Sequence, residues 1–280
     1  MKKPLKRKYI IILIAILLLI GIGEIIFFNS KPKENQYDVI WNRINNVYEG
    51  QIGNKPAHML IYRKEDTLKA YYIFANDSME YILNGTYNEK KKSFELYNED
   101  KTISFKGLTV ADTPDGDMLE GVFHSKNDGM DADFSLAHAY GLGDSENRDE
   151  LYNFLGYDTK QVEQFTDKII QAVQNDKVKE LSNLISYPLP VSINENKLMI
   201  NNRQEFIDHY DQIVTSSFKE AICNSFNRYL SGNYMGISLA YGKIYFSKET
   251  EDQELKINRI SNNDDDYINS NTDDYVITPE

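Results

Sequence analysis

Residues 103–124 read ISFKGLTVADTPDGDMLEGVFH, and this stretch decides the fold that the sequence predicts. Two runs of mixed apolar and polar residues, Ile103–Val110 and Leu119–His124, flank the turn-forming triplet Pro114-Asp115-Gly116. Strand-forming residues on either side of such a turn predict a β-hairpin. Each run also contains one glycine near an aromatic residue or a leucine, and a glycine inside a strand often marks a bulge or a tight bend.

The same unit recurs along residues 48–140. Eight candidate strands result: Tyr48–Ile52, His58–Arg63, Leu68–Phe74, Met79–Tyr87, Ser93–Tyr97, Ile103–Val110, Leu119–His124 and Ala132–Ala139. Short strands separated by regular turns predict an antiparallel β-meander domain, closed or nearly closed into a small barrel. We expect side chains to fill this barrel, with an internal ligand cavity as the alternative.

The N-terminus combines a basic tail with an apolar segment. Residues 1–8 contain five cations, and Tyr9–Phe28 is an almost unbroken apolar run of 20 residues. As a helix this run is about 30 Å long, enough to cross a membrane. The excess of cations before it predicts a cytoplasmic N-terminus and an extracytoplasmic C-terminal bulk. The sequence thus predicts a single-pass membrane protein with a transmembrane anchor at 9–28 and a cell-membrane localisation.

Two other roles of this segment are less well supported by the residues. A cleaved signal peptide would need a site of small residues, and Gly21-Ile22-Gly23 is a poor one. A lipoprotein would need a cysteine directly after the apolar run, whereas the one cysteine is Cys223. We therefore expect an uncleaved signal anchor.

Charge and cysteine content exclude several classes of protein. The net charge is −12, and because residues 1–33 carry a net +6, the rest of the chain carries −18. Such a chain is not a nucleic-acid binder, since duplex binding needs clustered Lys and Arg. A single cysteine excludes an intramolecular disulfide and the multi-cysteine metal motifs. At 41% hydrophobic residues the chain is able to bury a core.

The remaining segments divide the chain further. Residues 29–47 are expected to form a linker and a short helix, because apolar residues between Tyr37 and Val47 recur at helical spacing. Residues 141–148, GLGDSENR, read as a linker between two domains. The tail 262–280 is acidic and rich in Asn and Ser, and we expect it to be disordered.

Residues 149–261 change to helical periodicity and then return to strands. Val162, Phe165, Ile169 and Val173 give one apolar helix face, with Asp158 or Thr159 as the cap. The elements that follow are a helix at Val178–Ile185, a hairpin of Val191–Ile193 and Leu198–Ile200, a helix at Asn202–Ser216, and strands at Tyr229–Leu230, Met235–Ala240, Lys243–Phe246 and Leu255–Ile260.

This order of elements resembles the nuclear transport factor 2-like cone, also called cystatin-like, in which a curved sheet wraps a long helix. The resemblance covers about Asp149–Ser261 and is carried by the helices before Ser186–Val191, the helix Asn202–Ser216, and the Met235–Phe246 strand pair broken by Gly242. The fold class is therefore expected to be α+β: a transmembrane helix, an antiparallel β-meander or small barrel, and a helix-plus-curved-sheet cone. Because this fold hosts enzymes, ligand pockets and structural domains, it does not decide function.

Candidate chemistry is sparse. His58, His124 and His138 lie on predicted strands, where we expect structural roles. Asp208-His209-Tyr210-Asp211 lies on the predicted cone helix, and the resemblance implies that a pocket of this fold can hold an Asp/His pair. Adjacent helical residues point about 100° apart, so Asp208 and His209 do not both face one pocket. We expect no catalytic residue and keep His209 and Tyr210 as candidate ligand-binding residues.

No metal or cofactor is expected. The histidines lack metal-ligand spacing, and the acidic turns around Pro114 and Gly129 do not fit the twelve-residue calcium loop. Asp-Gly turns are explained by hairpin chemistry, although the sequence leaves calcium binding there open. Cys223 follows Ile222 on an apolar face, so an inert thiol is expected.

The sequence thus predicts a membrane-anchored, extracytoplasmic binding or scaffold protein of the cell envelope that is not an enzyme. The expected partners are the membrane, through the N-terminal helix, and an envelope or cell-wall protein. One alternative is a small-ligand-binding or weakly catalytic cone domain. Another is an assembly component of a secretion or conjugation machine.

Overall fold

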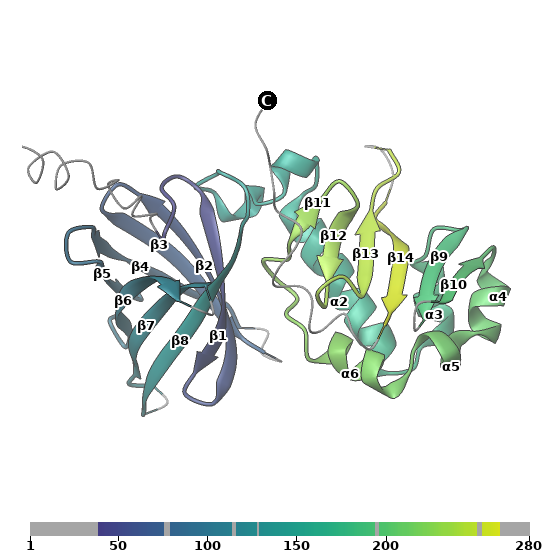
Figure 1. The fold of residues 1–280 in the computed structure, drawn as a ribbon, viewed down its shortest axis with the longest axis horizontal. Coiled ribbons are helices and arrows are strands. Elements are labelled where there is room, and N and C mark those ends of the chain that lie inside the picture. Colours follow the sequence, from purple (N-terminus) through teal and green to yellow (C-terminus); the bar gives the residue numbers. More distant parts are fainter. Residues whose placement is uncertain are drawn as a thin grey trace, which may run out of the picture. The chain divides into compact units, whose positions relative to one another are not determined.

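The computed structural model describes residues 39–75, 79–113, 116–127, 129–193, 196–250 and 254–263. These residues form a closed barrel of eight antiparallel strands and a second sheet of six strands (Figure 1). The barrel and the second sheet both fall within one compact unit of the chain, from Val39 onward.

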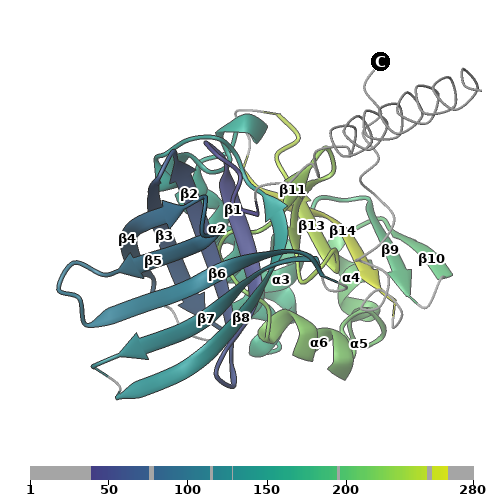
Figure 2. The same ribbon diagram turned by 60° about the vertical axis from the view of Figure 1, so that its left-hand side comes forward.

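The barrel strands follow one another around the wall, each pairing with the next, and β1 closes the barrel against β8. All eight predicted strands are present. Figure 2 shows β6, β7 and β8 as long ribbons of this wall. The strands are β1 (Asn45–Ile52), β2 (Lys55–Lys64), β3 (Thr67–Phe74), β4 (Tyr81–Asn88), β5 (Ser93–Tyr97), β6 (Ile103–Thr113), β7 (Gly116–Ser125) and β8 (Met130–Gly141).

Glycines in the strands are required where the wall is most tightly packed. Gly107 and Gly121 are direct cross-strand partners of β6 and β7. A Cβ atom on Gly121 would lie 2.1 Å from the carbonyl oxygen of Lys106, which no other residue could tolerate without moving the backbone. The repeated glycine of the sequence is therefore a packing requirement of the closed wall.

Aromatic side chains fill the barrel interior. Tyr48, Tyr72, Phe105 and Phe123 are all buried in one cluster. The ring centroid of Phe105 lies 5.1 Å from that of Tyr72 and 4.8 Å from that of Phe123. These distances are typical of tilted and edge-to-face aromatic pairs. These contacts agree with the expectation that the barrel's own side chains fill its interior.

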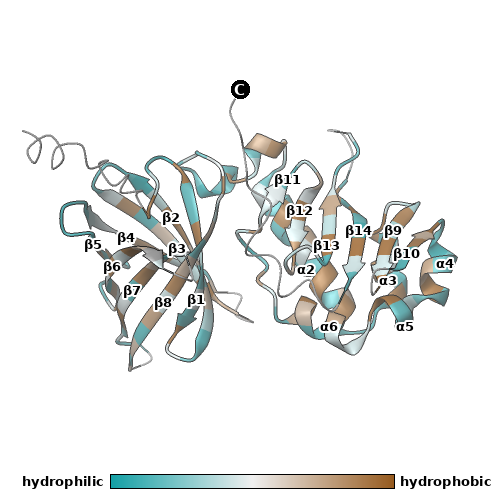
Figure 3. Ribbon diagram, in the orientation of Figure 1, coloured by the Kyte–Doolittle hydropathy of each residue, from teal (hydrophilic) through white to brown (hydrophobic). Residues whose placement is uncertain are grey.

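Strands β2 and β3 are buried on both faces. Met59 and Ile61 belong to the barrel core, whereas Leu60 between them belongs to the core of the second sheet. In β3, Tyr72 faces the barrel core, while Tyr71 and Ile73 join the other core. A strand that packs on both sides loses the alternation of buried and exposed residues, which explains why Ala57–Arg63 of β2 are buried one after another. Figure 3 shows the hydropathy of the strands.

The second sheet has the strand order β10-β9-β14-β13-β12-β11 and is antiparallel except for the β14–β9 pair. Helix α2 packs on this sheet, with the rings of Phe165 and Phe246 5.1 Å apart. The strands are β9 (Leu189–Ile193), β10 (Asn196–Ile200), β11 (Gly232–Asn233), β12 (Gly236–Leu239), β13 (Ile244–Ser247) and β14 (Lys256–Asn262). The helices are η1 (Arg148–Glu150), η2 (Asn153–Leu155), α2 (Thr159–Gln174), α3 (Val178–Asn183), α4 (Arg203–Asp208), α5 (Tyr210–Ile213) and α6 (Ser216–Cys223).

The structure corrects two predicted helices. No helix lies within residues 39–47, because Val39 and Ile40 enter the barrel core and strand β1 begins at Asn45. The single helix expected over Asn202–Ser216 is wrong, since the chain there forms α4 and α5 and then begins α6. The Thr215 side chain accepts a hydrogen bond from the Phe218 amide, at 3.3 Å, and so starts a new helix at that point. The Asp158 cap of α2 is confirmed, since its carboxylate accepts a hydrogen bond from the Gln161 amide at 2.8 Å.

The predicted fold class is wrong as well. The described residues form mostly antiparallel sheet, with a fully closed eight-stranded barrel and short helices. In the described ranges only α2 is longer than eight residues, and its buried residues lie on one face.

The predicted membrane anchor, Tyr9–Phe28, lies outside the described residues. Within the part of the chain that the structure describes, no helix combines the length and the apolarity needed to cross a membrane. This finding contradicts the single-pass membrane protein and the cell-membrane localisation stated above, and both predictions are withdrawn. The division of the chain into domains stays a prediction.

Candidate functional site

A cavity of about 260 Å³ lies where the barrel strands β1, β2 and β8 meet the chain around α6 and β12. Its lining is mostly apolar and aromatic, including Tyr140, Phe226 and Ala240, and it contains the two ionisable side chains Glu49 and His58. Concave, mainly apolar sites with a few polar groups are typical of small-molecule binding. We refer to this cavity as the Glu49 pocket.

The register of the β1–β2 hairpin places Glu49 beside His58. The two residues are direct cross-strand partners, so their side chains leave the same face of the sheet. Glu49 Oε1 lies 3.0 Å from His58 Nε2, an ion-pair distance, although the angle does not make this contact an aligned hydrogen bond. The His58 side chain is 2% exposed and that of Glu49 is 20% exposed, so the pair is at the inner wall of the pocket.

The imidazole of His58 is packed between aromatic rings but is not satisfied as a polar group. Its centroid lies 4.5 Å from that of Phe226 and 5.8 Å from that of Tyr229. Both ring nitrogens are buried, and neither has a hydrogen-bond partner among the described residues. A buried polar group without a partner costs about 1–3 kcal/mol, and His138 Nε2 and Tyr152 Oη share this state elsewhere in the fold.

Tyr241 closes the pocket from the turn between β12 and β13. Its hydroxyl donates a hydrogen bond to Glu49 Oε2 at 2.5 Å. Ala240 and Tyr241 have φ angles of 51° and 54°, and Gly242 has a φ of 88°. Non-glycine residues in this left-handed region cost about 1–3 kcal/mol each and are common at binding sites.

Glu49 is ionised in this environment. Burial opposes ionisation, but the contacts with His58 and Tyr241 outweigh it and lower the pKa of the Glu49 carboxyl. Tyr140, also in the lining, donates its hydroxyl hydrogen to the carbonyl oxygen of Tyr229 at 2.7 Å, and burial raises its pKa well above the ordinary value. Besides this carboxylate, the imidazole and the two phenol rings, the lining contains uncharged polar side chains: Asn224, Ser225, Ser231 and Ser238.

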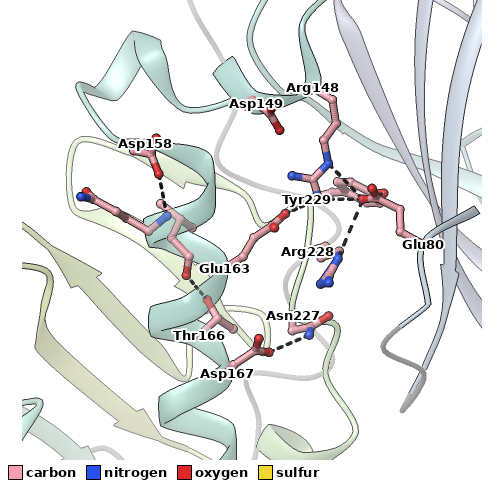
Figure 4. A network of polar contacts seen from close by, with 12 residues as sticks. Glu80, Arg148, Asp149, Asp158, Glu163, Thr166, Asp167, Asn227, Arg228 and Tyr229 are labelled. Atoms are coloured by element: carbon pink, nitrogen blue, oxygen red, sulfur yellow. Dashed lines mark hydrogen bonds and ion pairs between the residues drawn. The ribbon is translucent and has the colours of Figure 1, made fainter. Parts of the chain in front are cut away.

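A second polar cluster joins the barrel to helix α2 and is shown in Figure 4. Arg148 donates from Nε and Nη2 to Glu80 Oε1, at 3.0 and 2.6 Å, and from Nη2 to Glu163. The Tyr229 hydroxyl donates to the same Glu80 oxygen at 2.6 Å, and Arg228 Nε lies 3.8 Å from it. We refer to these five residues as the Glu80 cluster.

The pKa shifts in the Glu80 cluster arise because Glu80 and Glu163 share the guanidinium of Arg148. Burial opposes the charge of Arg148, but Glu163 and Glu80 outweigh it and raise the pKa of the guanidinium. Burial raises the pKa of Glu163, although Arg148 and Arg228 act in the opposite direction. Because the cluster holds two arginines against two glutamates, it is neutral when all four are charged. Arg148 and Tyr229 donate to the glutamates, whereas Arg228 Nη1 is buried without a hydrogen-bond partner among the described residues.

The candidates taken from the sequence are not brought to the Glu49 pocket. His209 lies between α4 and α5, where its Nδ1 is 2.9 Å from the carbonyl oxygen of Glu205. Tyr210 is buried in the core of the second sheet, and burial raises its pKa to about 12. Neither residue is among the described residues that line the pocket. Their role in binding stays a prediction.

The other histidines lie outside the pocket. His124 Nδ1 contacts the Asp131 carboxylate, whereas the His138 ring lies 4.7 Å from that of Trp41 and its Nε2 is buried without a hydrogen-bond partner among the described residues. Burial lowers the pKa of His138. Over the described ranges, no group of three His, Cys, Asp or Glu side chains is arranged to hold a metal ion.

A second cavity of about 240 Å³ shares Ser225 and Phe226 with the Glu49 pocket. Its carboxylate, Asp167, accepts a hydrogen bond from Asn227 at 2.7 Å. Burial raises the pKa of its cysteine, Cys223, which keeps the thiol protonated. This cavity therefore offers less free chemistry than the Glu49 pocket.

Sequence reasoning missed the site because it treated His58 as a structural residue. One signal was available: a two-residue turn at Gly53-Asn54 pairs Ile52 with Lys55, and the same register pairs Glu49 with His58. No comparable signal exists for Phe226 or Tyr241, which come from distant parts of the chain. Searches for related proteins find no family model, no curated protein and no solved structure that matches this chain significantly, so its likeness to the nuclear transport factor 2-like fold stays a hypothesis.

Proposed function

We propose that this protein is a non-catalytic binding protein and that the Glu49 pocket is the site of a small ligand. The observation that carries the proposal is the Glu49 carboxylate, which is 20% exposed at the wall of a mostly apolar cavity and is held there by His58 and Tyr241. A concave, mainly apolar site with a few placed polar groups is the usual form of a small-molecule site.

The chemistry around His58 supports binding over catalysis. A nucleophile of the serine or cysteine type needs a base within hydrogen-bond reach, and that base needs an orienting group. Glu49 is placed to orient His58, but no hydroxyl or thiol of the described residues hydrogen-bonds to either ring nitrogen. The pair thus lacks the third member of a nucleophilic site.

The size of the cavity limits the ligand. About 260 Å³ is slightly below the range of roughly 300–1,000 Å³ typical of pockets for drug-sized ligands. A compact molecule with an apolar body and one polar group suits a lining of Phe226, Leu230 and Ala240 with Glu49 and His58 at its wall.

The proposal is tested by a screen of small aromatic molecules against the full chain, followed by NMR resonances of the His58 ring. Binding in the pocket should shift the His58 ring protons and leave those of His124, which lies on the barrel strand β7, unchanged. The variant His58→Phe keeps an aromatic ring and removes both nitrogens, so it should lose the bound molecules. A screen in which hits bind His58→Phe as tightly as the wild type would contradict the proposal.

A further inference from the structure

We infer that the ligand of the Glu49 pocket is a compact organic cation, a protonated primary amine on a small apolar body. The inference rests on the proposed function, because it assigns the chemical class of the molecule bound at that same site. Its basis is the charge and hydrogen-bonding character of the lining.

The charges in the pocket favour a cation. Glu49 is the carboxylate of the lining, and none of the described lining residues is Lys or Arg. The chain as a whole has a net charge of −12, and such a field raises the local concentration of cations.

Hydrogen-bonding capacity points the same way. An ionised carboxylate has about four acceptor positions. Among these, one is used by the Tyr241 hydroxyl, and His58 Nε2 approaches the other oxygen. The remaining acceptor positions of Glu49 call for a ligand that donates hydrogen bonds.

The aromatic lining suits the same ligand. Phe226, Tyr140 and Tyr241 contribute rings to the pocket, and aromatic rings attract ammonium groups through their faces. The apolar part of the ligand would contact Leu230 and Ala240, which carry no charge. An ammonium group with a short apolar body satisfies the carboxylate and the rings together.

The test compares three probes that share one ring: benzylamine, benzyl alcohol and benzoate, titrated into the full chain at neutral pH. We expect benzylamine to bind at least about tenfold more tightly than benzyl alcohol, and benzoate to bind more weakly than either. Glu49→Gln should remove the advantage of the amine over the alcohol. The control Glu120→Gln makes the same change of charge at an exposed position of β7 and should leave the advantage intact.

The outcomes separate this inference from the proposed function. If benzyl alcohol or benzoate binds as tightly as the amine, or if Glu49→Gln leaves the amine's advantage unchanged, the cation inference is overturned while the pocket remains a binding site. If none of the three probes shifts the His58 resonances, both are overturned.

Discussion

Two glutamate-centred sites connect the barrel to the rest of the compact unit, and they differ in how far their polar groups are occupied. In the Glu80 cluster, Arg148 and Tyr229 donate to Glu80, and Arg148 also reaches Glu163 (Figure 4). In the Glu49 pocket, Glu49 accepts a hydrogen bond from Tyr241 and has His58 Nε2 at 3.0 Å, and its side chain is 20% exposed beside a cavity. Glutamate therefore joins two arginines at one site and lines a cavity at the other.

The choice of cation explains the difference. The guanidinium of Arg148 is always charged and has a fork of donors that binds two carboxylates at once. The imidazole of His58 has two nitrogens, and only Nε2 lies near a carboxylate oxygen, at 3.0 Å. An arginine cluster thus suits permanent attachment between two sheets, and a histidine–glutamate pair suits reversible contact with a ligand.

The largest expected effect comes from removing the shared cation of the Glu80 cluster. Arg148→Met leaves Glu80 and Glu163 without the guanidinium that they share. Removing one partner of a buried ion pair lowers the free energy of unfolding by about 3–5 kcal/mol. We expect the free energy of unfolding, measured by urea denaturation, to fall by about that amount. The matched control is Lys64→Met, which removes an exposed ion pair with Glu146 and should cause no resolvable change. A loss for Arg148→Met as small as that of the control would show that the cluster is not structural.

The next effect concerns the pair in the Glu49 pocket. Glu49→Gln and His58→Phe each leave one member without its partner, whereas the double variant removes both. We expect a coupling free energy of about 1–3 kcal/mol from the double-mutant cycle, with the double variant more stable than the sum of single losses implies. Additive losses would mean that the 3.0 Å contact contributes nothing to stability.

The sequence predicted the parts of the fold that depend on local pattern. The eight barrel strands were found because turn residues and glycines separate short runs of aromatic and β-branched residues, as in residues 103–124. The helix expected before Val47 was wrong because a few apolar residues in a short segment fit the helical period as well as an irregular or extended segment. In the structure Val39 and Ile40 pack into the barrel core, and Asn42 forms a bridge with Arg63.

The candidate site could be predicted only in part. The pairing of Glu49 with His58 follows from a two-residue turn, so it was open to sequence reasoning. The ring of Phe226 and the hydroxyl of Tyr241 reach the pair across more than 160 residues, and no local pattern reports such contacts. His209 and Tyr210 were chosen as candidate ligand-binding residues because the sequence pattern predicts on which helix a residue lies. It does not predict which residues of two sheets line a common pocket.

A smaller effect distinguishes the two sites by the sign of their response to acid. The pKa of Glu49 is lowered in the folded state, so its contribution to stability is present above the ordinary value of 4.5 and is lost as the pH falls through the folded pKa. The pKa of Glu163 is raised, so its contribution is present below 4.5 and is lost as the pH rises through the folded pKa. Unfolding free energies measured against pH should therefore show a shallower acid loss for Glu49→Gln and a steeper one for Glu163→Gln. Equal slopes for both variants would contradict the assigned directions.

The smallest expected effect tests whether Tyr241 is part of the pocket or only lies at its edge. Tyr241→Phe removes the hydrogen bond to Glu49 but keeps the ring, and a half-exposed hydroxyl contributes about 0.5–1 kcal/mol to the free energy of unfolding. The informative measurement is the pKa of the Glu49 carboxyl by NMR, which should rise in the variant because one of the groups that lower it is gone. Tyr234→Phe, at a side chain that is 94% exposed, is the control and should leave that pKa unchanged. If the pKa of Glu49 is the same in both variants, His58 alone holds the carboxylate in its charged form, and the strained turn at Ala240 and Tyr241 has no electrostatic part in the pocket.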